Sequence, residues 1–308
     1  MRVLVTGGAG FIGSYVTKGL LDLGYEVVVL DNFSSGAKKN LPTSNLFKVI
    51  DADICDRKKL QDLYSERFDG IIHLAAQVSV PESVKNPMID SQINITGTLN
   101  MLDLAKNTGV QSFVFASTAA VYGNQVSVPI LENCQLSPET PYGISKLASE
   151  YYIQSICKQL NINYCILRYA NVYGPKQSDK GEGGVIKIFS EQLLNNRKST
   201  IYGNGLQTRD FIFVEDVANA TIKALNGKNI ILNVSTNKEV TINDIYDFIK
   251  KECQSSLDPI YTNEREGDIF RSCLSNDLIK KELSWAPSFE MEQGVKRTIQ
   301  ELTVQKNE

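Results

Sequence analysis

The chain has 308 residues, of which 42% are hydrophobic and 22% charged, and its formal net charge is −3. This composition is globular, with enough apolar residues for a large core or for one domain with a smaller lobe. The slightly acidic balance provides no basic surface for nucleic acid or anionic membrane. No apolar run approaches the roughly 20 residues that span a bilayer, and the first apolar stretch is too short for a signal peptide. We therefore expect a cytoplasmic protein without a nucleic-acid or membrane partner.

The cysteine and histidine content limits the chemistry available to this chain. The six cysteines form no CxxC pair and are Cys55, Cys134, Cys157, Cys165, Cys253 and Cys273. We expect reduced thiols and no metal site. The single histidine, His73, ends an apolar run, which favours a packed side chain near the end of a strand. One histidine cannot build a histidine-based metal site, and it argues against a Ser/His/Asp triad.

Short β-branched runs alternate with longer amphipathic segments in the first half of the chain. Residues 2–6, 26–30, 46–50, 70–74, 112–117 and 163–169 are typical of strands, and residues 11–23, 88–107 and 142–160 are typical of helices. Buried strands that alternate with helices form a parallel sheet covered on both faces. The sequence therefore predicts an α/β fold, with a Rossmann-type, doubly wound parallel sheet in residues 1–173.

The alternation loosens after Asn171, where several glycines indicate a loop. Further on we expect helices at 185–195, 215–225 and 241–252 and another sheet strand at 230–234, and residues 211–214 lead into the second of these helices. Thr241 and Asp244 have the spacing of a capping box at the start of the last of these helices. Residues 174–308 are expected to form mainly a smaller α/β C-terminal substrate lobe, while segments near 209–235 return to the first domain.

A glycine-rich turn lies between the first expected strand and the first expected helix. It contains Gly7, Gly10 and Gly13. In this context the first glycine permits a tight turn, the second lets the backbone approach a pyrophosphate, and the third lets helix and strand pack closely. The amides and the dipole at the start of the helix favour phosphate charge. This turn predicts a dinucleotide site.

Asp31 and Asn32 follow the second strand, at the position where a carboxylate accepts hydrogen bonds from the adenosine ribose. A carboxylate there repels a 2′-phosphate, so the pair favours NAD over NADP. Lys38 and Lys39 follow in what we interpret as an exposed, charged loop. The remaining candidates for lining the nucleotide are Asp53 after the third strand and Leu74, Ala75 and Ala76 after the fourth.

Tyr142 and Lys146 lie four residues apart at the start of a long expected helix, and hence on one of its faces. An unperturbed tyrosine, with a pKa near ~10, is a poor base at neutral pH, but a nearby ammonium or an oxidised nicotinamide favours the phenolate. Ser117 and Thr118 end the fifth strand, where ligands bind in open α/β sheets. The four residues together predict a site that acts on an alcohol or a ketone.

These motifs resemble the extended short-chain dehydrogenase/reductase family, in particular its UDP-glucose 4-epimerase-like, NAD-dependent nucleotide-sugar epimerases. The resemblance covers nearly the whole chain. It rests on TGGAGFIG at 6–13, DNFSSG at 31–36, HLAA at 73–76, Ser117 with Thr118, YGISK at 142–146, RYANVYGP at 168–175, RDFIFV at 209–214 and REGD at 265–268. It implies a bound NAD and a UDP-sugar substrate.

The resemblance also implies which residues hold the two ligands. The implied cofactor contacts are Gly7, Gly10, Phe11, Ile12, Gly13, Asp31, Asn32, Asp53, Ile54, Leu74, Ala75, Ala76, Gln77, Asn94, Ser117, Tyr142 and Lys146. The implied substrate contacts are Thr118, Tyr142, Asn171, Val185, Tyr202, Arg209, Arg265, Asp268 and Ser272. Two arginines in this set are well suited to clamp a diphosphate through charge-assisted hydrogen bonds.

The implied reaction is C4 epimerisation through a transient 4-keto sugar. Tyr142 takes the proton of the sugar 4-hydroxyl, NAD takes and returns the hydride, and Thr118, with Ser117 as a second hydroxyl, hydrogen-bonds the same oxygen. Related 4,6-dehydratases and decarboxylases carry acidic residues directly after the active-site threonine, where this chain has Ala119 and Ala120. Two alternatives are another nucleotide-sugar oxidoreductase or epimerase of the family and a non-catalytic NAD-sensing module.

Two further expectations follow from the resemblance. Ser272 stands where a bulky aromatic residue excludes N-acetyl groups in relatives, so UDP-N-acetylglucosamine and UDP-N-acetylgalactosamine join UDP-glucose and UDP-galactose as candidate substrates. The helices expected at 88–107 and 142–160 carry apolar residues on more than one face. The family pairs such helices into a four-helix bundle, which implies a homodimer.

Overall fold

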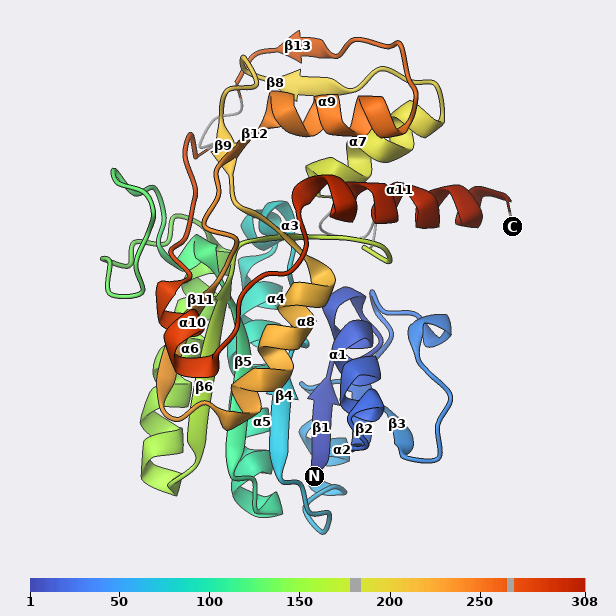
Figure 1. The fold of residues 1–308 in the computed structure, drawn as a ribbon. Coiled ribbons are helices and arrows are strands. Elements are labelled where there is room, and N and C mark those ends of the chain that lie inside the picture. The colour runs from blue at the N-terminus through green and yellow to red at the C-terminus, as the bar shows by residue number, and fades with distance from the viewer. Residues whose placement is uncertain (178–183, 265–268, 308) are drawn as a thin grey trace.

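The computed structural model describes residues 1–177, 184–264 and 269–307 (Figure 1). Seven parallel strands form the central sheet in the order β11-β6-β5-β4-β1-β2-β3. These strands are β1 (Arg2–Thr6), β2 (Glu26–Asp31), β3 (Phe47–Asp51), β4 (Gly70–His73), β5 (Ser112–Thr118), β6 (Asn163–Tyr169) and β11 (Ile230–Val234). The strand order reverses direction beside β1, as in a doubly wound sheet. The predicted Rossmann-type α/β fold is confirmed.

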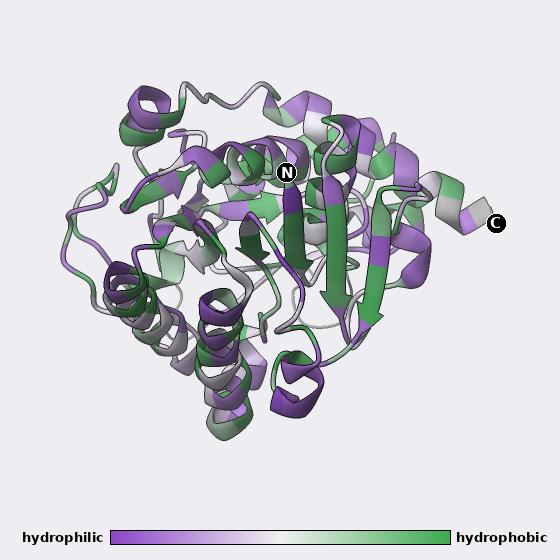
Figure 2. Ribbon diagram, turned by 90° about the horizontal axis from the view of Figure 1, so that it is seen from below, coloured by the Kyte–Doolittle hydropathy of each residue, from purple (hydrophilic) through white to green (hydrophobic). Residues whose placement is uncertain are grey.

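Helices cover both faces of this sheet, and successive strand residues alternate between two cores. On one face pack α1 (Phe11–Asp22), α8 (Val214–Lys223) and α10 (Asp277–Leu283); on the other pack α2 (Arg57–Gln61), α5 (Gly97–Thr108) and α6 (Pro141–Leu160). In β1, for example, Val3 and Val5 enter the first core and Leu4 enters the second. Figure 2 shows the resulting pattern, with hydrophobic strands between helices of mixed hydropathy.

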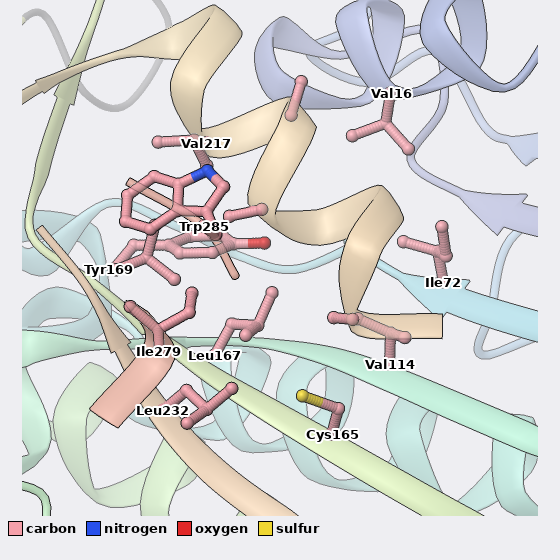
Figure 3. Packing of buried hydrophobic residues seen from close by; sticks show 14 of the residues in the cluster. Val16, Ile72, Val114, Cys165, Leu167, Tyr169, Val217, Leu232, Ile279 and Trp285 are labelled. Atoms are coloured by element: carbon pink, nitrogen blue, oxygen red, sulfur yellow. The ribbon is translucent and has the colours of Figure 1, made fainter. Parts of the chain in front are cut away.

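The first core includes residues from the far end of the chain. Trp285, the only tryptophan, is buried beside Val217 of α8 and Ile279 of α10 (Figure 3). Its indole Nε1 donates to the carbonyl of Asp216 at 3.2 Å. The sequence predicted the return of β11 to the sheet, but it gave no indication that α10 and Trp285 also pack against it.

Local capping explains where two of the helices begin. Thr140 precedes α6, its hydroxyl accepts the Gly143 amide at 3.2 Å, and Pro141 occupies the first turn, where its missing N–H costs nothing. The helix α9 (Ile242–Glu252) starts with the predicted capping box, in which Thr241 and Asp244 each accept the other's backbone amide.

The long helix expected at 88–107 is present, with a π-helical turn inside it. The segments α4 (Pro87–Ser91), the π-helical turn (Gln92–Thr96) and α5 follow one another without a gap, and the short helix α3 (Val80–Lys85) precedes them. A π turn inserts one residue into the helical repeat and is common near functional sites. Here it presents Asn94 to the segment after β4 and to α6, as described below. Periodicity alone could not reveal this turn, because a single insertion hardly changes the apolar pattern.

A smaller set of elements lies beyond the carboxyl ends of the sheet (Figure 1). It contains β7 (Asn171–Tyr173), α7 (Val185–Leu194), β8 (Thr200–Tyr202), β9 (Thr208–Arg209), β10 (Phe211–Phe213), β12 (Val240–Thr241), α9, β13 (Ile260–Thr262) and α11 (Met291–Asn307). The strands pair as β7 with β10, β9 with β12 and β8 with β13. A third core, with α7, α9 and α11 around it, holds this part together.

The six cysteines are all free thiols in the structure. Cys157, Cys165 and Cys273 are buried, and the other three are half-buried. None of the described helices is both long and apolar enough to cross a bilayer.

Candidate active site

A cavity of about 1260 Å³ runs along the carboxyl ends of the strands and into the smaller set of elements. Of the predicted ligand-binding residues that the structure describes, all but Asn94 line it. Arg265 and Asp268 lie outside the described residues. The cavity therefore brings the predicted cofactor residues and most of the predicted substrate residues onto one continuous surface.

The glycine turn lines this cavity and is built around close backbone contacts. Gly7 has φ +68°, and a Cβ there would lie 2.8 Å from the amide nitrogen of Ala75. A Cβ on Gly13 would overlap the Gly7 carbonyl oxygen. A Cβ on Gly10 would meet only that same oxygen, at 3.1 Å. The turn therefore needs glycine at 7 and 13 for its own packing, whereas Gly10 leaves space beside the cavity.

The start of α1 also suits a pyrophosphate. Its N-cap residue is Gly10, and no side chain caps this end of the helix. The first amides of a helix lack partners within the helix, and its dipole favours anions there. Phe11, Ile12 and Gly13 line the cavity at this point. The residues present thus provide a cradle that fits the diphosphate of NAD.

Asp31 at the end of β2 is buried and anchors the glycine turn. Its carboxylate accepts the amide of Ala9 at 2.9 Å and that of Phe33 at 2.8 Å. The side chain of Asn32 donates to Asp53 at 2.7 Å, which joins the loop after β2 to the loop after β3. These predicted cofactor residues therefore form one connected wall, and Ile54 continues it.

The loop after β2 packs over this wall, which the sequence did not predict. A Cβ on Gly36 would lie 2.8 Å from the carbonyl carbon of Ala9, so the loop after β2 packs directly on the glycine turn. The side chain of Asn40 donates to the Ala9 carbonyl at 3.1 Å. Gly36 belongs to the DNFSSG motif, but its role depends on a contact between segments that are distant in the chain.

Leu74, Ala75, Ala76 and Gln77 line the cavity after β4, whereas Asn94 does not. The Asn94 side chain accepts the Gln77 amide at 2.8 Å and donates to the Gln77 carbonyl at 3.0 Å and to the Ser145 hydroxyl at 3.1 Å. Asn94 thus fixes the cavity wall and α6 from behind instead of facing the cavity.

His73 is a packed residue, as the sequence favoured. Its ring lies within hydrogen-bond distance of the hydroxyls of Thr6, at 2.7 Å, and Thr98, at 3.1 Å. Burial, with a smaller effect from the Lys146 ammonium, lowers the pKa of His73 to about 3. The imidazole is therefore neutral at physiological pH and supports the sheet end without acting as an acid.

Tyr142 and Lys146 reach the cavity from the first turns of α6. Both side chains are almost fully buried. The Tyr142 amide donates to the Ser83 hydroxyl of α3 at 3.2 Å, which fixes the start of α6. The Lys146 ammonium lies 4.3 Å from the centre of the Phe115 ring. The helix thus presents a phenol and an ammonium to the same cavity from neighbouring turns.

The hydroxyls of Thr118 and Ser117 have different surroundings. Thr118 lines the cavity, and its hydroxyl oxygen accepts the Ala120 amide at 3.2 Å. Ser117 is buried, and its hydroxyl donates to the carboxylate of Glu150 on α6. Successive residues of a strand point to opposite faces, so the structure gives the two hydroxyls separate partners. The Ser117 proton is held by Glu150.

The cavity is also lined by five residues that the sequence predicted as substrate contacts, Asn171, Val185, Tyr202, Arg209 and Ser272. Each comes from a different segment, on β7, α7, β8, β9 and the loop before α10. Sequence reasoning did not predict their neighbours Phe189 and Gln192 of α7 and Ile201 of β8, which also line the cavity. The apolar residues of α7 predicted only a helix face packed in the core. Which of them face a ligand depends on how β8 packs against the helix.

Asp210 is a further residue that the sequence did not single out. It is buried, and it accepts the amides of Thr236, at 2.9 Å, Asn237, at 3.0 Å, and Leu274, at 3.4 Å. It thus ties the segment that carries Arg209 to the segment that carries Ser272. Within residues 1–177, 184–264 and 269–307, no group of three or more acidic, cysteine or histidine residues is placed to hold a metal ion.

Comparisons with known proteins agree with this geometry. The model of the NAD dependent epimerase/dehydratase family matches residues 3–235. The chain is 42% identical over 299 residues to the putative UDP-glucose 4-epimerase of Methanocaldococcus jannaschii, covering 96% of this chain and 97% of that protein.

Two solved structures are similar over almost their whole length. UDP-glucose 4-epimerase of Thermotoga maritima with UDP-glucose has a TM-score of 0.96 at 37% identity, covering 99% of this chain and 100% of that one. UDP-N-acetylglucosamine 4-epimerase of Methanobrevibacter ruminantium, in complex with UDP-N-acetylmuramic acid, has a TM-score of 0.93 at 34% identity, covering 99% and 98%. The chain therefore belongs to the NAD dependent epimerase/dehydratase family.

Proposed function

We propose that this protein is an NAD-dependent UDP-sugar 4-epimerase, which inverts the configuration at C4 through a transient 4-keto sugar. The observation that carries the proposal is the single cavity shared by the glycine turn, by Thr118, Tyr142 and Lys146, and by Arg209. The first part of the cavity suits NAD, and the second suits a nucleotide diphosphate and its sugar. The similarity to named UDP-sugar 4-epimerases supports this choice.

The chain's own residues move and hold one proton in this reaction. Tyr142 accepts the proton of the sugar 4-hydroxyl, and the Lys146 ammonium on the next turn favours the phenolate that does so. Thr118, whose oxygen already accepts the Ala120 amide, donates its hydroxyl hydrogen to the same sugar oxygen. NAD, which the glycine turn and Asp31 would hold, would supply the hydride chemistry at C4 when bound. Tyr142 then gives the proton back, so no net proton is exchanged.

Two alternatives are less well supported. A 4,6-dehydratase is among the related proteins, at 35% identity, but Ala119 and Ala120 directly follow Thr118 and supply no acid for water loss. A non-catalytic NAD sensor would not need a phenol and an ammonium buried at the cavity. The presence of both Tyr142 and Lys146 therefore favours catalysis.

The direct test is to incubate the purified protein with a panel of UDP-sugars and to identify C4 epimers by NMR or chromatography. We expect interconversion of UDP-glucose and UDP-galactose without added reductant. Protein that binds NAD and converts none of the UDP-sugars would support the sensor instead, and a dehydrated keto sugar as the product would support the dehydratase.

Ser272 provides a test of sugar specificity. It lines the cavity and is half-buried, so its small side chain leaves room for an N-acetyl group. We expect Ser272→Tyr to lower kcat/KM for UDP-N-acetylglucosamine by about 100-fold, since a 1–3 kcal/mol steric cost corresponds to about 10–200-fold, and to change kcat/KM for UDP-glucose less than threefold. Equal losses on both sugars would contradict this assignment.

Asp31 provides a test of cofactor choice. We expect Asp31→Asn to raise the affinity for NADP relative to NAD by about tenfold, because the substitution removes a charge that repels a 2′-phosphate. Calorimetric titration of the cofactor-free protein with both dinucleotides measures this ratio. Asp51→Asn is the matched control, because Asp51 ends the neighbouring strand β3 and does not line the cavity. An unchanged ratio in Asp31→Asn would assign Asp31 to anchoring alone.

We also propose a homodimer that forms through α4 to α6. Large apolar side chains on this side are exposed, including Met88 at 80%, Tyr151 at 57% and Ile144 at 53%. A partner that packs on this surface would remove that area from water. Sedimentation equilibrium is expected to give twice the chain mass of 34.2 kDa. A monomer at micromolar concentration would contradict the proposal.

We also propose which part of the chain binds each ligand. Residues 1–173, with segments near 209–235, would bind NAD, and residues 174–308 would mainly bind the nucleotide sugar. Six free thiols are typical of a reducing compartment, which supports a cytoplasmic location.

A further inference from the structure

A buried ion pair lies directly behind the proposed catalytic residues. The guanidinium of Arg168, on β6, donates from Nη2 to Glu150 at 2.6 Å and from Nε at 3.1 Å. Both side chains are almost completely buried, at 2% and 0% exposure. A buried pair of this kind is a weak source of stability, because desolvation offsets the attraction between the charges. We therefore look for a role of this ion pair other than stabilising the fold.

Glu150 connects the two elements that supply the proposed catalytic groups. It lies on α6, four residues after Lys146 and eight after Tyr142, hence on the same face at about 6 and 12 Å along the helix axis. Its carboxylate also accepts the hydroxyl of Ser117, the neighbour of Thr118 on β5. One carboxylate thus binds α6 to the end of β5.

Arg168 extends this connection into β6 and the segments around it. Arg168 pairs in register with Ser117 across the sheet. Its Nη1 donates to the Tyr122 hydroxyl at 3.0 Å, and that hydroxyl donates to Asn233 of β11 at 2.7 Å. The position of α6 relative to three strand ends is therefore set by one network of charged and neutral hydrogen bonds.

We propose that the Glu150–Arg168 pair is a positioning device for the proposed epimerisation: it holds Tyr142 and Lys146 on α6 in register with Thr118 on β5. This inference rests on the proposed function. Tyr142 and Thr118 must reach the same sugar oxygen from different elements, and a displacement of about 1 Å costs about 100-fold in rate. Neither Glu150 nor Arg168 lines the cavity, so the pair acts through the residues that do.

The pair also has an electrostatic consequence. Glu150 is the single acidic residue of α6, and it lies one turn from Lys146. Arg168 forms an ion pair with Glu150, so we expect this carboxylate not to compete with Tyr142 for the Lys146 ammonium. Further titratable groups near this face include His73 of β4, Glu82 of α3, Asp90 of α4, Tyr122 after β5 and Glu132 in the following loop.

Two variants separate position from charge. Arg168→Lys keeps the charge and loses the two-pronged contact with Glu150. We expect kcat to fall about 10- to 100-fold, KM for the UDP-sugar and affinity for NAD to change less than threefold, and the kcat–pH profile to stay in place. Glu150→Gln keeps the shape and leaves Arg168 as an extra cation. We expect the same loss of kcat and an acid limb of the kcat–pH profile that moves to lower pH.

Asp216→Asn is the matched control. Asp216 is also a buried carboxylate on a helix, and it accepts the Ser288 hydroxyl at 2.6 Å and the amides of Ser288, at 2.9 Å, and Phe289, at 3.1 Å. We expect it to lower the melting temperature about as much as Glu150→Gln and to leave kcat unchanged. Wild-type kcat in both pair variants, or an equal kcat loss in Asp216→Asn, would overturn the inference.

Failure of the proposed function is distinguished by a measurement that needs no turnover. If the wild type converts none of the UDP-sugars, the epimerase proposal fails, and the electrostatic link is then decided by tyrosinate absorbance. The signal of Tyr142 is the difference between each protein and the same protein with Tyr142→Phe. We expect this signal to appear at lower pH in Glu150→Gln than in the wild type, and an unchanged titration would overturn the link.

Discussion

Replacing Tyr142 with phenylalanine is expected to lower kcat for UDP-sugar epimerisation by about 10³-fold, in the middle of the 10²–10⁴ range for a general base. The substitution removes only the phenolic oxygen from a ring that is already almost fully buried at the cavity. The proton of the 4-hydroxyl then has no acceptor on α6, whereas the glycine turn and the predicted substrate contacts are unchanged. KM and NAD content should therefore stay near their wild-type values.

The matched control is Tyr151→Phe, on the same helix. Tyr151 lies on the proposed dimer surface and does not line the cavity, and the substitution keeps its apolar ring, so loss of its hydroxyl should leave kcat unchanged. Initial rates measured from the appearance of the C4 epimer, together with the absorbance of bound cofactor, check both variants. A Tyr142→Phe protein with full turnover would remove Tyr142 from the mechanism.

Replacing Gly13 with alanine is expected to abolish tight NAD binding, with a loss of affinity of at least about 100-fold. The new Cβ would overlap the Gly7 carbonyl oxygen and lie 2.8 Å from the Gly7 carbonyl carbon. Both atoms belong to the backbone, so α1 must move away from the turn that is expected to hold the pyrophosphate. Overpacking of this kind also lowers the free energy of unfolding by about 1–3 kcal/mol.

Gly24→Ala controls for the loss of stability alone. Gly24 follows α1, has φ +76°, and has no atom within 4 Å of an added Cβ. A left-handed alanine costs roughly 1–2 kcal/mol, so the two variants should unfold at similar denaturant concentrations. Calorimetry should find NAD affinity lost only in Gly13→Ala. Equal NAD affinity in both variants would contradict the assigned role of the turn.

Local sequence signals were sufficient where a residue acts through its immediate neighbours. The glycine turn follows a strand and opens a helix, and its spacing in this context predicted the tight backbone contacts of Gly7 and Gly13. The capping box of Thr241 and Asp244 was likewise predictable from three-residue spacing. The continuous apolar runs also predicted the central strands, because a strand that is buried on both faces is apolar throughout.

The remaining features depend on which segments meet in the folded chain. Nothing local distinguishes Asn94 from Ser117 as predicted ligand contacts, yet Asn94 braces Gln77 from behind the cavity, whereas Ser117 lines the cavity and donates its hydroxyl to Glu150. Glu150 and Arg168 are eighteen residues apart, and neither has a sequence pattern that predicts a buried pair. Trp285 joins the first core from the far end of the chain for the same reason.

By itself, the sequence determined the doubly wound fold, the dinucleotide turn and the Tyr142–Lys146 spacing, because each rests on periodicity or on contacts a few residues apart. Only the tertiary structure decided that the Ser117 hydroxyl bonds Glu150 while the Thr118 hydroxyl accepts the Ala120 amide, that Asn94 stands behind the cavity wall, and that α10 returns to the sheet. These outcomes depend on the packing of α6, β5 and β6 against one another, and long-range packing has no period in the sequence.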